Sequence, residues 1–176
     1  MNLVLIGPQS CGKTSVGKKL AQKLGKKFVD TDELLLANYC STHDQISSPI
    51  SIHEIYQKHG ESYFRDLETQ IISTLSSLEQ TIVATGGGSV MRKENREELR
   101  KIGQLFYLEL SSQAWRKRMK ERKLPCFLQQ EDFIEHYKTR RLIYQQAADV
   151  IIPADGLSID QLLEAIISLL EHPSST

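Results

Sequence analysis

Cysteine, net charge and long apolar runs are all scarce in this sequence, and each absence excludes a class of protein. The chain has 22 basic and 22 acidic residues, so its formal charge is zero and no global field favours nucleic acid or an anionic membrane. Only three cysteines occur, Cys11, Cys40 and Cys126, and they form no C-x-x-C pair. This pattern is typical of a reducing compartment and provides no structural zinc site.

The histidines and the apolar segments exclude two further classes. The five histidines show no metal-ligand spacing such as H-E-x-x-H and are interpreted as structural or solvated: His43, His53, His59, His136 and His172. No apolar run approaches the ~20 residues that span a bilayer, and the first residues, MNLVLIG, contain no basic leader region. We therefore expect a cytoplasmic protein with no membrane and no nucleic-acid partner.

The sequence alternates strand-like and helix-like segments, as one α/β domain does. Its 176 residues, 40% of them hydrophobic, are sufficient for an ordinary core. Short apolar segments predict five strands, at Leu3–Ile6, Lys27–Asp30, Thr81–Thr85, Gln104–Leu108 and Asp149–Ile152. Helical crossovers between them imply a parallel sheet with both faces covered, whose ligands gather beyond the carboxyl ends of the strands. The stretches Asn38–Ser51 and Arg122–Glu131 are expected to be irregular.

The most specific motif follows the first predicted strand. In LIGPQSCGKTSVGKKL, residues 5–20, the pattern G-x-x-x-x-G-K-[ST] falls at a strand-to-helix turn, which is the context that a phosphate-binding loop requires. Its glycines let backbone N–H groups converge on phosphate oxygens at the positive end of the helix. Lys13 is expected to reach the β- and γ-phosphates of a nucleotide, and the Thr14 hydroxyl to ligate Mg²⁺. The predicted nucleotide-binding residues of this loop are Gly7, Ser10, Cys11, Gly12, Lys13, Thr14 and Ser15.

Two further segments of interest lie at strand ends. The second strand ends in DTD, so the carboxylates of Asp30 and Asp32 either reach the crevice or cap the following helix, a contribution of about 1 kcal/mol. The third strand ends in three glycines, 86–88, which either let another molecule approach bare backbone or form a flexible turn. Together with the phosphate-binding loop, both segments favour a ligand site at this edge of the sheet.

The order of these motifs resembles that of the shikimate kinase family of small P-loop phosphotransferases. The family pattern continues with G-E-x-x-F-R-x-x-E, found here as GESYFRDLE from Gly60 to Glu68, and with an arginine four residues before a tyrosine, here Arg140 and Tyr144. The resemblance covers nearly the whole chain. It implies a three-layer P-loop kinase fold in one kinase domain, residues 1–171, with a five-stranded parallel sheet of order 2-3-1-4-5.

The resemblance also implies a reaction and a division of the domain. A shikimate kinase transfers the γ-phosphoryl group of its co-substrate ATP to the 3-hydroxyl of shikimate, with Mg²⁺ as cofactor, in aromatic amino acid biosynthesis. We expect a substrate-binding subregion over about residues 32–70 and a mobile lid over about residues 118–131. The tail 172–176 is expected to fray, and the protein to be a monomer that binds shikimate and ATP.

Residue by residue, the resemblance assigns roles on the substrate side. Arg65 and Arg140 match the two arginines that bind the shikimate carboxylate, and a planar guanidinium grips a carboxylate through paired charge-assisted hydrogen bonds. Glu68, three residues after Arg65, is expected to hold that guanidinium, unless Arg65 forms only a surface ion pair. Gly87 is expected to offer its N–H to a substrate hydroxyl. The implied substrate-binding residues are Asp32, Arg65, Glu68, Gly86, Gly87, Gly88 and Arg140.

The two aspartates receive different roles from the same resemblance. Asp30 matches the residue that holds Mg²⁺ through water, so the implied metal site is Thr14 and Asp30. Asp32 matches the residue that binds the reacting hydroxyl, and phosphoryl transfer requires only that it orient this group and accept its proton late. Lys13 and Asp32 are therefore the predicted catalytic residues.

The sequence departs from the family pattern in the lid. Family members usually have an arginine directly before a proline, whereas a leucine precedes Pro125 here, so either Arg122 or Lys123 is expected to contact phosphate. Arg118 matches the arginine that packs on adenine, or it belongs to a solvated basic helix face.

Smaller departures concern the nucleotide loop and the substrate side. Ser10 stands where the family commonly has glycine, and an insertion over Cys40–Pro49 lengthens the segment after Asp30. Neighbouring Cys11 is either acidified by the helix N-terminus or simply small enough to fit.

Rival functions are compatible with part of the pattern. A gluconate-type sugar-acid kinase shares the loop and the size but does not explain GESYFRDLE together with Arg140. A nucleoside monophosphate kinase needs more arginines around its two nucleotides. The non-enzyme alternative is a catalytically silent nucleotide-binding regulatory domain, and the presence of Lys13, both aspartates and both arginines argues against it.

Overall fold

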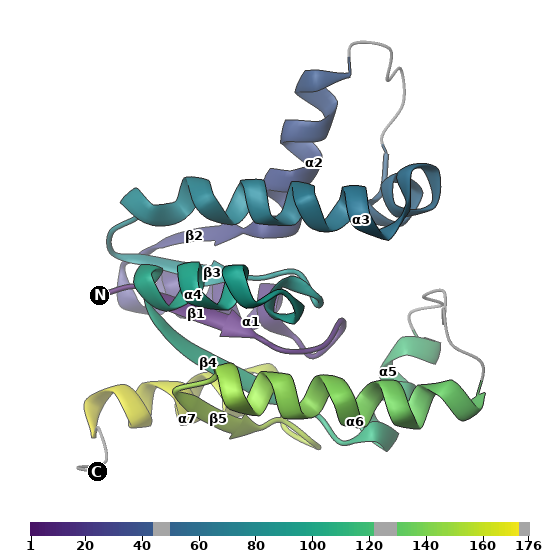
Figure 1. The fold of residues 1–176 in the computed structure, drawn as a ribbon. Helices are drawn as coiled ribbons and strands as arrows, with labels where there is room; N and C mark the ends of the chain where they lie inside the picture. The colour runs from purple at the N-terminus through teal and green to yellow at the C-terminus, as the bar shows by residue number, and fades with distance from the viewer. Residues whose placement is uncertain (44–49, 122–129, 173–176) are drawn as a thin grey trace.

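Five parallel strands form the centre of the computed structural model, which describes residues 1–43, 50–121 and 130–172 (Figure 1). They are β1 (Leu3–Ile6), β2 (Lys27–Asp30), β3 (Thr81–Ala84), β4 (Gln104–Glu109) and β5 (Val150–Pro153). Their order in the sheet is β2-β3-β1-β4-β5, and all four pairings are parallel. The central strand β1 places Val4 opposite Val83 on one side and Leu105 on the other. This confirms the predicted sheet and its order.

The connections between the strands are helical, as the crossovers of a parallel sheet require. The α-helices are α1 (Lys13–Leu24), α2 (Thr31–Thr42), α3 (Ile52–Ser73), α4 (Lys93–Ile102), α5 (Ser112–Glu121), α6 (Gln130–Ala147) and α7 (Ile159–Glu171). Two short 3₁₀ turns are η1 (Thr74–Ser77) and η2 (Ser89–Met91). Within the described part of the chain, no helix is both long and apolar enough to cross a membrane.

Strict alternation along the strands builds a core on each face of the sheet. Leu3 and Leu5 pack with the apolar faces of α1, α5 and α7, whereas Val4 and Ile6 pack with η1, α4 and the end of α6. Successive strand residues point to opposite faces, so a continuous apolar strand such as β1 must be covered on both sides. The result is the three-layer arrangement expected from the sequence.

A third, smaller core lies beyond the β2 edge, where α2 packs against α3. Leu35 and Tyr39 of α2 are fully buried against Ile55, Phe64 and Ile71 of α3. Figure 1 shows these two helices at one edge of the sheet, with α5 and α6 on the opposite side. The two helical groups therefore form opposite walls around the carboxyl ends of the strands.

Local signals explain where several of these helices begin. Ser51 and Glu54 form a reciprocal capping box at the start of α3, and Ser158 and Gln161 do the same at α7. Helix α1 ends at Leu24, and the next residue, Gly25, adopts the left-handed conformation typical of a helix C-cap.

Several predicted boundaries differ from the structure. Asn38–Thr42 belongs to α2 rather than to an irregular stretch, and α6 already begins at Gln130. Residues 44–49 and 122–129, which include most of the predicted insertion and lid, lie outside the described residues, as does the tail 173–176. Strand β5 begins one residue late, at Val150. The preceding Asp149 still contacts β4, because its side chain accepts a hydrogen bond from the Leu105 N–H at 2.7 Å and its own N–H donates to the Leu105 carbonyl at 2.9 Å.

Candidate active site

The phosphate-binding loop has the backbone that its glycines were expected to provide. Gly7 has a φ of 143° and Gly12 one of 109°, both in the region that side chains rarely adopt. A side chain on Gly7 would also meet the Leu108 carbonyl oxygen at 2.9 Å. The sequence therefore has no alternative to glycine at the first turn of this loop.

Lys13 lies beneath the loop and is buried despite its charge. Its Nζ donates hydrogen bonds to the carbonyls of Gly7 at 2.8 Å and Pro8 at 2.9 Å, and the Cys11 sulfur lies 3.6 Å away. A buried ammonium requires such acceptors, since an unpaired one is strongly disfavoured. The arrangement holds a positive charge at the mouth of α1, where an anion is also attracted by the helix N-terminus.

Asp30 joins the loop to the end of β2. Its carboxylate accepts a hydrogen bond from the Thr14 hydroxyl at 2.7 Å and another from the Asp32 backbone N–H at 2.9 Å. The second bond makes Asp30 the N-cap of α2, so the capping interpretation is confirmed for this residue. The first bond places a carboxylate beside the Thr14 hydroxyl, an oxygen pair of the kind that Mg²⁺ prefers.

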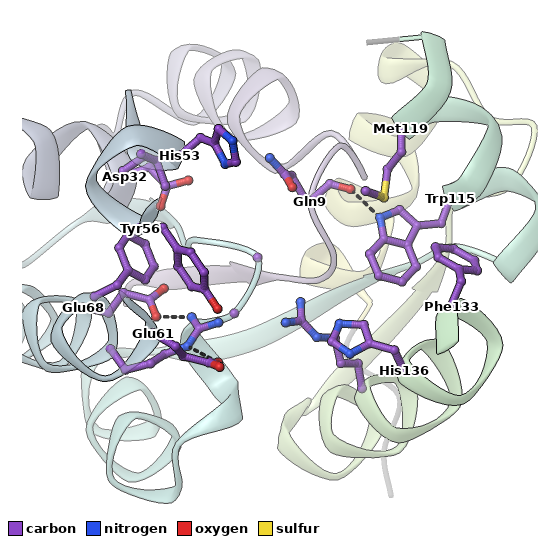
Figure 2. Close-up of a pocket in the computed structure, with 16 residues that line it drawn as sticks. Gln9, Asp32, His53, Tyr56, Glu61, Glu68, Trp115, Met119, Phe133 and His136 are labelled. Atoms are coloured by element: carbon purple, nitrogen blue, oxygen red, sulfur yellow. Dashed lines mark hydrogen bonds and ion pairs between the residues drawn. The ribbon is translucent and has the colours of Figure 1, made fainter. Parts of the chain in front are cut away.

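Asp32 points into a cavity at the same edge of the sheet (Figure 2). Burial is the main cause that raises its pKa from an ordinary carboxyl value to about 6, and the negative charge of Asp30 adds to this effect while Lys13 opposes it. A carboxylate with such a pKa, facing a cavity, is a candidate proton acceptor.

The cavity has a volume of about 490 Å³ and is shared by elements far apart in the sequence. Its lining residues are Gln9, Asp32, Ile52, His53, Tyr56, Glu61, Phe64, Arg65, Glu68, Gly87, Gly88, Trp115, Met119, Phe133, His136 and Arg140. It therefore brings together Asp32, both predicted carboxylate-binding arginines and two of the three glycines.

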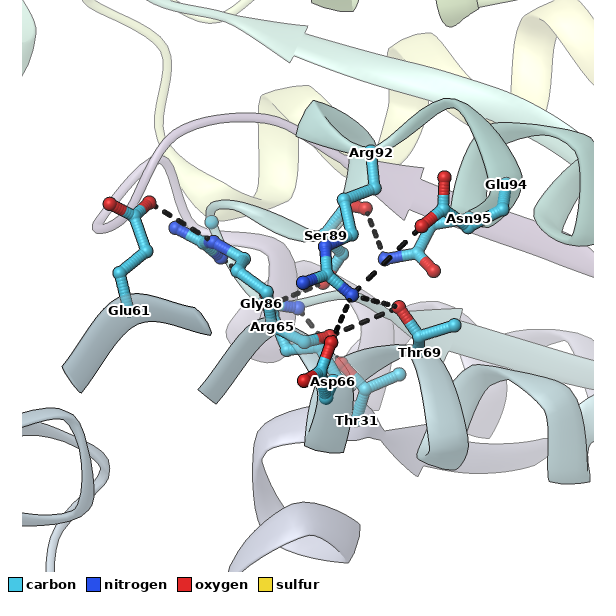
Figure 3. Close-up of polar contacts among 12 residues, drawn as sticks. Thr31, Glu61, Arg65, Asp66, Thr69, Gly86, Ser89, Arg92, Glu94 and Asn95 are labelled. Atoms are coloured by element: carbon cyan, nitrogen blue, oxygen red, sulfur yellow. Dashed lines mark hydrogen bonds and ion pairs between the residues drawn. The ribbon is translucent and has the colours of Figure 1, made fainter. Parts of the chain in front are cut away.

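Arg65 is held by carboxylates on its own helix. Its Nη1 pairs with Glu68, and its Nε lies 3.5 Å from a carboxylate oxygen of Glu61, as Figure 3 shows for the latter contact. Burial works against the charge of Arg65, but Glu68 and Glu61 raise its pKa above the ordinary value. Glu68 is itself only 4% exposed and accepts a hydrogen bond from the Ser89 hydroxyl at 3.1 Å. Arg65 is thus a largely buried, oriented guanidinium, with 12% of its side chain exposed, rather than a surface ion pair.

A second set of contacts fixes the region around Arg65 against α4. Arg92 pairs with Asp66 at 2.7 Å and reaches the Thr69 hydroxyl at 3.4 Å, while the Asn95 amide donates to the Ser89 carbonyl at 2.9 Å (Figure 3). These bonds tie the second half of α3 to the loop that follows β3.

The three glycines after β3 make room for the site's own groups. A methyl group on Gly88 would overlap the Arg65 guanidinium, and one on Gly86 would lie 2.6 Å from the Asp32 carboxylate. On Gly87 it would meet the Gln9 backbone nitrogen at 2.8 Å. Gly86 is buried behind the cavity wall, where its N–H donates to the Thr31 hydroxyl at 2.8 Å. The glycines therefore permit the close approach of loop, aspartate and arginine, and the segment is not a flexible turn.

Arg140 reaches the cavity from the opposite wall, on α6. One turn later, the buried Tyr144 hydroxyl donates to the Gly87 carbonyl, and the Tyr144 ring stacks on Tyr107 with centroids 5.0 Å apart. Because residues four apart share a helix face, this anchor fixes Arg140 toward the cavity. The spacing of arginine and tyrosine in the sequence has this physical cause.

A second hollow of about 290 Å³ adjoins the phosphate-binding loop on its other side. It is lined by Ser10, Cys11, Gly12, Ser15, Arg118, Glu121, Leu157, Ser158, Ile159 and Leu162. Arg118 donates to the Cys11 carbonyl at 3.0 Å and the Ala154 carbonyl at 3.3 Å, so it is not part of a solvated face. The buried Ser10 hydroxyl has no hydrogen-bond partner among the described residues. Arg122, the other predicted nucleotide contact of the lid, lies outside them.

Sequence reasoning missed several lining residues of both hollows. His53 and His136 were interpreted as structural or solvated, but both line the larger cavity. Burial and the charge of Arg140 lower the pKa of His136 to about 4, so its imidazole is neutral at physiological pH. Tyr56 and Trp115 were not singled out, because a lone aromatic in a helical pattern signals only a core position. The segment Leu157–Ile159 carried no signal beyond the serine that caps α7.

The described residues contain no group of three or more histidine, cysteine or acidic side chains that could hold a metal ion by themselves. The pair of Thr14 and Asp30 still suits Mg²⁺, because this ion commonly takes one or two protein oxygens and completes its shell with waters and substrate phosphates.

Comparison with known proteins agrees with this site. A family model described as shikimate kinase matches residues 9–171. The chain is 37% identical to a shikimate kinase of Thermodesulfovibrio yellowstonii, over 99% of this chain and 97% of that protein, and 32% identical to one of Alkaliphilus oremlandii, over 94% and 96%. It also resembles the solved shikimate kinase of Acinetobacter baumannii in complex with shikimate, with a TM-score of 0.85, 27% identity and coverage of 99% and 95%. By sequence and by structure, the chain belongs to the shikimate kinase family.

Proposed function

We propose that the chain transfers the γ-phosphoryl group of ATP to the 3-hydroxyl of shikimate, giving ADP and shikimate 3-phosphate. The observation that carries this proposal is the placement of Arg65 and Arg140 in one cavity with Asp32 and the loop residue Gln9. Two guanidinium groups suit a substrate with one carboxylate, and a proton-accepting carboxylate suits its reacting hydroxyl. Relatives named shikimate kinase, one of them solved with shikimate, support the same assignment.

The residues of the cavity divide the work between binding and proton transfer. Arg65 and Arg140 bind the carboxylate, and Gly87 offers its N–H to a ring hydroxyl. Lys13, at the base of the loop, stabilises the β- and γ-phosphates. As the substrate oxygen bonds to the γ-phosphorus, the bond to the β,γ-bridging oxygen breaks and ADP leaves with that oxygen. Asp32 accepts the hydroxyl proton, so charge and atoms balance.

The metal site is proposed on the oxygen pair beside the loop. The Thr14 hydroxyl would bind Mg²⁺ directly, and the Asp30 carboxylate would hold its water ligands. When bound, the ion supplies positive charge to the phosphates. Arg118, whose guanidinium lies between the loop and the segment after β5, is assigned to the adenine side of the nucleotide.

The division of the domain is proposed from the same elements. Residues 32–70 carry Asp32, Tyr56 and Arg65 and form the substrate-binding subregion, and residues 118–131 form the lid. The cytoplasmic location and the monomeric state remain predictions from the sequence.

A substrate panel tests the proposal. ADP release is measured with Mg²⁺ and ATP against shikimate, quinate, gluconate and nucleoside monophosphates, and we expect shikimate to dominate. Asp32→Asn, purified identically, controls for contaminating kinases. Equal or faster turnover of gluconate would refute the substrate while leaving the nucleotide loop intact. Nucleotide binding without turnover of any acceptor would favour the silent regulatory domain.

A further inference from the structure

Trp115 is the only tryptophan in the sequence, and it contacts both halves of the site. Its indole N–H donates a hydrogen bond to the Gln9 backbone carbonyl at 2.9 Å, and its ring forms part of the cavity wall (Figure 2). Only 4% of the residue is exposed. None of the motifs that define the site includes it.

Gln9, the partner of Trp115, lies at the tip of the phosphate-binding loop. On its other side, the loop tip approaches Gly87 so closely that a methyl group there would lie 2.8 Å from the Gln9 nitrogen. The Gln9 backbone is therefore held between the indole of α5 and the glycine segment of the cavity.

The ring of Trp115 packs on the helix that carries Arg140. Its centroid lies 5.0 Å from that of Phe133 and 6.2 Å from that of Tyr137, both on α6. It also lies 6.4 Å from His136, one turn before Arg140, with the two planes nearly parallel. One side chain thus connects the loop tip to the helix of the second carboxylate-binding arginine.

The hydrogen bonds of Lys13 connect the loop tip to the place where nucleotide phosphates are expected to bind. Lys13 donates to the carbonyls of Gly7 and Pro8, the two residues before Gln9. An ammonium group has three N–H donors, and these two carbonyls already occupy two of those of Lys13. Under the proposed function, phosphate oxygens therefore compete with the two carbonyls next to Gln9 for the Lys13 ammonium group, and they also bind the loop N–H groups.

We propose that Trp115 is a positioning residue that couples nucleotide binding to shikimate binding, through Gln9 on one side and α6 on the other. Bound phosphates hold the loop tip in one conformation, and the Gln9 carbonyl then holds the Trp115 indole. Shikimate therefore binds to a cavity wall whose side chains are already ordered. Because coupling between sites is reciprocal, shikimate strengthens nucleotide binding by the same factor. This inference rests on the proposed function, since it assumes both ligands.

Calorimetry on two variants tests the coupling. The Kd of shikimate is measured with and without saturating MgADP for the wild type, Trp115→Phe and Tyr137→Phe. Typical couplings are about 5- to 150-fold, so we expect MgADP to tighten shikimate binding at least ~5-fold in the wild type. Trp115→Phe keeps a ring in the wall but loses the N–H, and its ratio should fall to within about 2-fold of one.

Tyr137→Phe is the matched control, because it also removes one donor to a backbone carbonyl, that of Leu110 at 3.0 Å, from the same cluster. Because its hydroxyl bonds to Leu110 and not to Gln9, this variant should keep the wild-type ratio. A Trp115→Phe protein with the wild-type ratio, or a wild type without coupling, overturns the inference alone. A wild type that binds no shikimate contradicts the proposed function instead.

Fluorescence of the wild type provides a test that does not depend on a folded variant. Because the single tryptophan contacts Gln9, MgADP alone should change its emission before shikimate is added. Emission that does not respond to saturating MgADP overturns the proposal.

Discussion

Asp32 and Asp30 are two residues apart but have different surroundings. Asp30 is buried, bonded to the Thr14 hydroxyl and to the backbone of α2, whereas Asp32 lies in the cavity wall. Burial and the neighbouring negative charge raise the pKa of Asp32 to about 6. Their different surroundings therefore give two identical side chains different roles: Asp30 organises the loop, and Asp32 is suited to accept a proton.

Replacing Asp32 with Asn tests the proton acceptor. The amide keeps the shape but cannot take the hydroxyl proton, so kcat should fall by about 10²–10⁴-fold while the affinity for MgATP stays nearly unchanged. Because the base must be ionised, kcat/KM of the wild type should fall as the pH drops through about 6, and the residual activity of Asp32→Asn should not. A variant with wild-type kcat would leave Asp32 without a catalytic role.

Replacing Asp30 with Asn tests the metal assignment. The amide oxygen can still cap α2, but the negative charge that would hold the metal's water ligands is lost. A Mg²⁺ titration at saturating shikimate should therefore show a midpoint shifted to higher concentration, with Asp32→Asn as the matched control. If only Asp32→Asn moves this midpoint, the two assignments are reversed.

Arg65→Met separates substrate binding from nucleotide binding. Methionine keeps much of the stem's packing but removes the guanidinium, so shikimate should bind at least ~10-fold more weakly, a loss of about 1.4 kcal/mol or more. The Kd of MgADP, measured alone in the same calorimeter, is expected to remain within about 2-fold. An unchanged shikimate Kd contradicts the role of Arg65.

At the scale of elements, helix α3 is broken where the two parts of its cavity wall meet. Gly60 has a φ of 81° and a ψ of 175°, and it separates the segment with His53 and Tyr56 from the segment with Arg65. Just before the break, His59 Nε2 lies 2.7 Å from the buried Tyr39 hydroxyl of α2. The break therefore turns two consecutive helical segments toward one cavity.

Gly60→Ala should destabilise the fold through the backbone rather than through a clash. Among the described residues, no atom lies within 4 Å of the position that a methyl group would take, but the conformation is one that essentially only glycine adopts. We expect the free energy of unfolding in urea to fall by about 1–3 kcal/mol. The exposed helical site Ser62→Ala is the control and should change it by less than about 0.5 kcal/mol. An equal effect of both substitutions would exclude backbone strain.

Helices and strands could be predicted from the sequence where local periodicity or turn chemistry alone determined the secondary structure. Continuous apolar strands such as Leu3–Ile6 and the loop glycines gave the sheet and the first helix, because their periodicity and turn chemistry have few alternatives. The end of α2 was missed because Asn38–Thr42 contains weak helix formers, which Tyr39 overrides by burying its ring against α3. Boundaries decided by tertiary contacts are not visible in local sequence.

At the scale of the whole molecule, the residues of the site also divide into those that the sequence could identify and those that only tertiary packing brings to the cavity. Asp32, Arg65 and Arg140 were assigned to the site through the resemblance to the shikimate kinase family, whose motifs have charged residues at these positions. Trp115 and His136 were not, because only the packing of α5 against α6 brings them to the cavity. Figure 2 shows four of the side chains that line the cavity across from Asp32: Trp115, Met119, Phe133 and His136.

The cavity also affects the stability of the whole fold. The pKa of Asp32 is raised to about 6 in the native protein, from 3.8, the ordinary value that it regains on unfolding, so the folded state binds the proton more tightly. This contribution to stability is complete below about pH 4 and is lost as the pH rises through about 6. At neutral pH, the ionised carboxylate therefore opposes folding, as functional groups in active sites often do.

Asp32→Asn should consequently stabilise the protein that it inactivates. The neutral amide removes the buried charge, so the free energy of unfolding at pH 7.5 should rise by about 1–3 kcal/mol, since one pKa unit corresponds to about 1.4 kcal/mol. Urea unfolding at several pH values checks this, and the gain should shrink toward zero near pH 4. Glu33→Gln, which removes an exposed carboxylate paired with Lys18, is the control and should give no gain at either pH. If Asp32→Asn is no more stable than the wild type at pH 7.5, then Lys13 and Arg65 already compensate the charge, and the substrate hydroxyl meets a carboxylate of ordinary basicity.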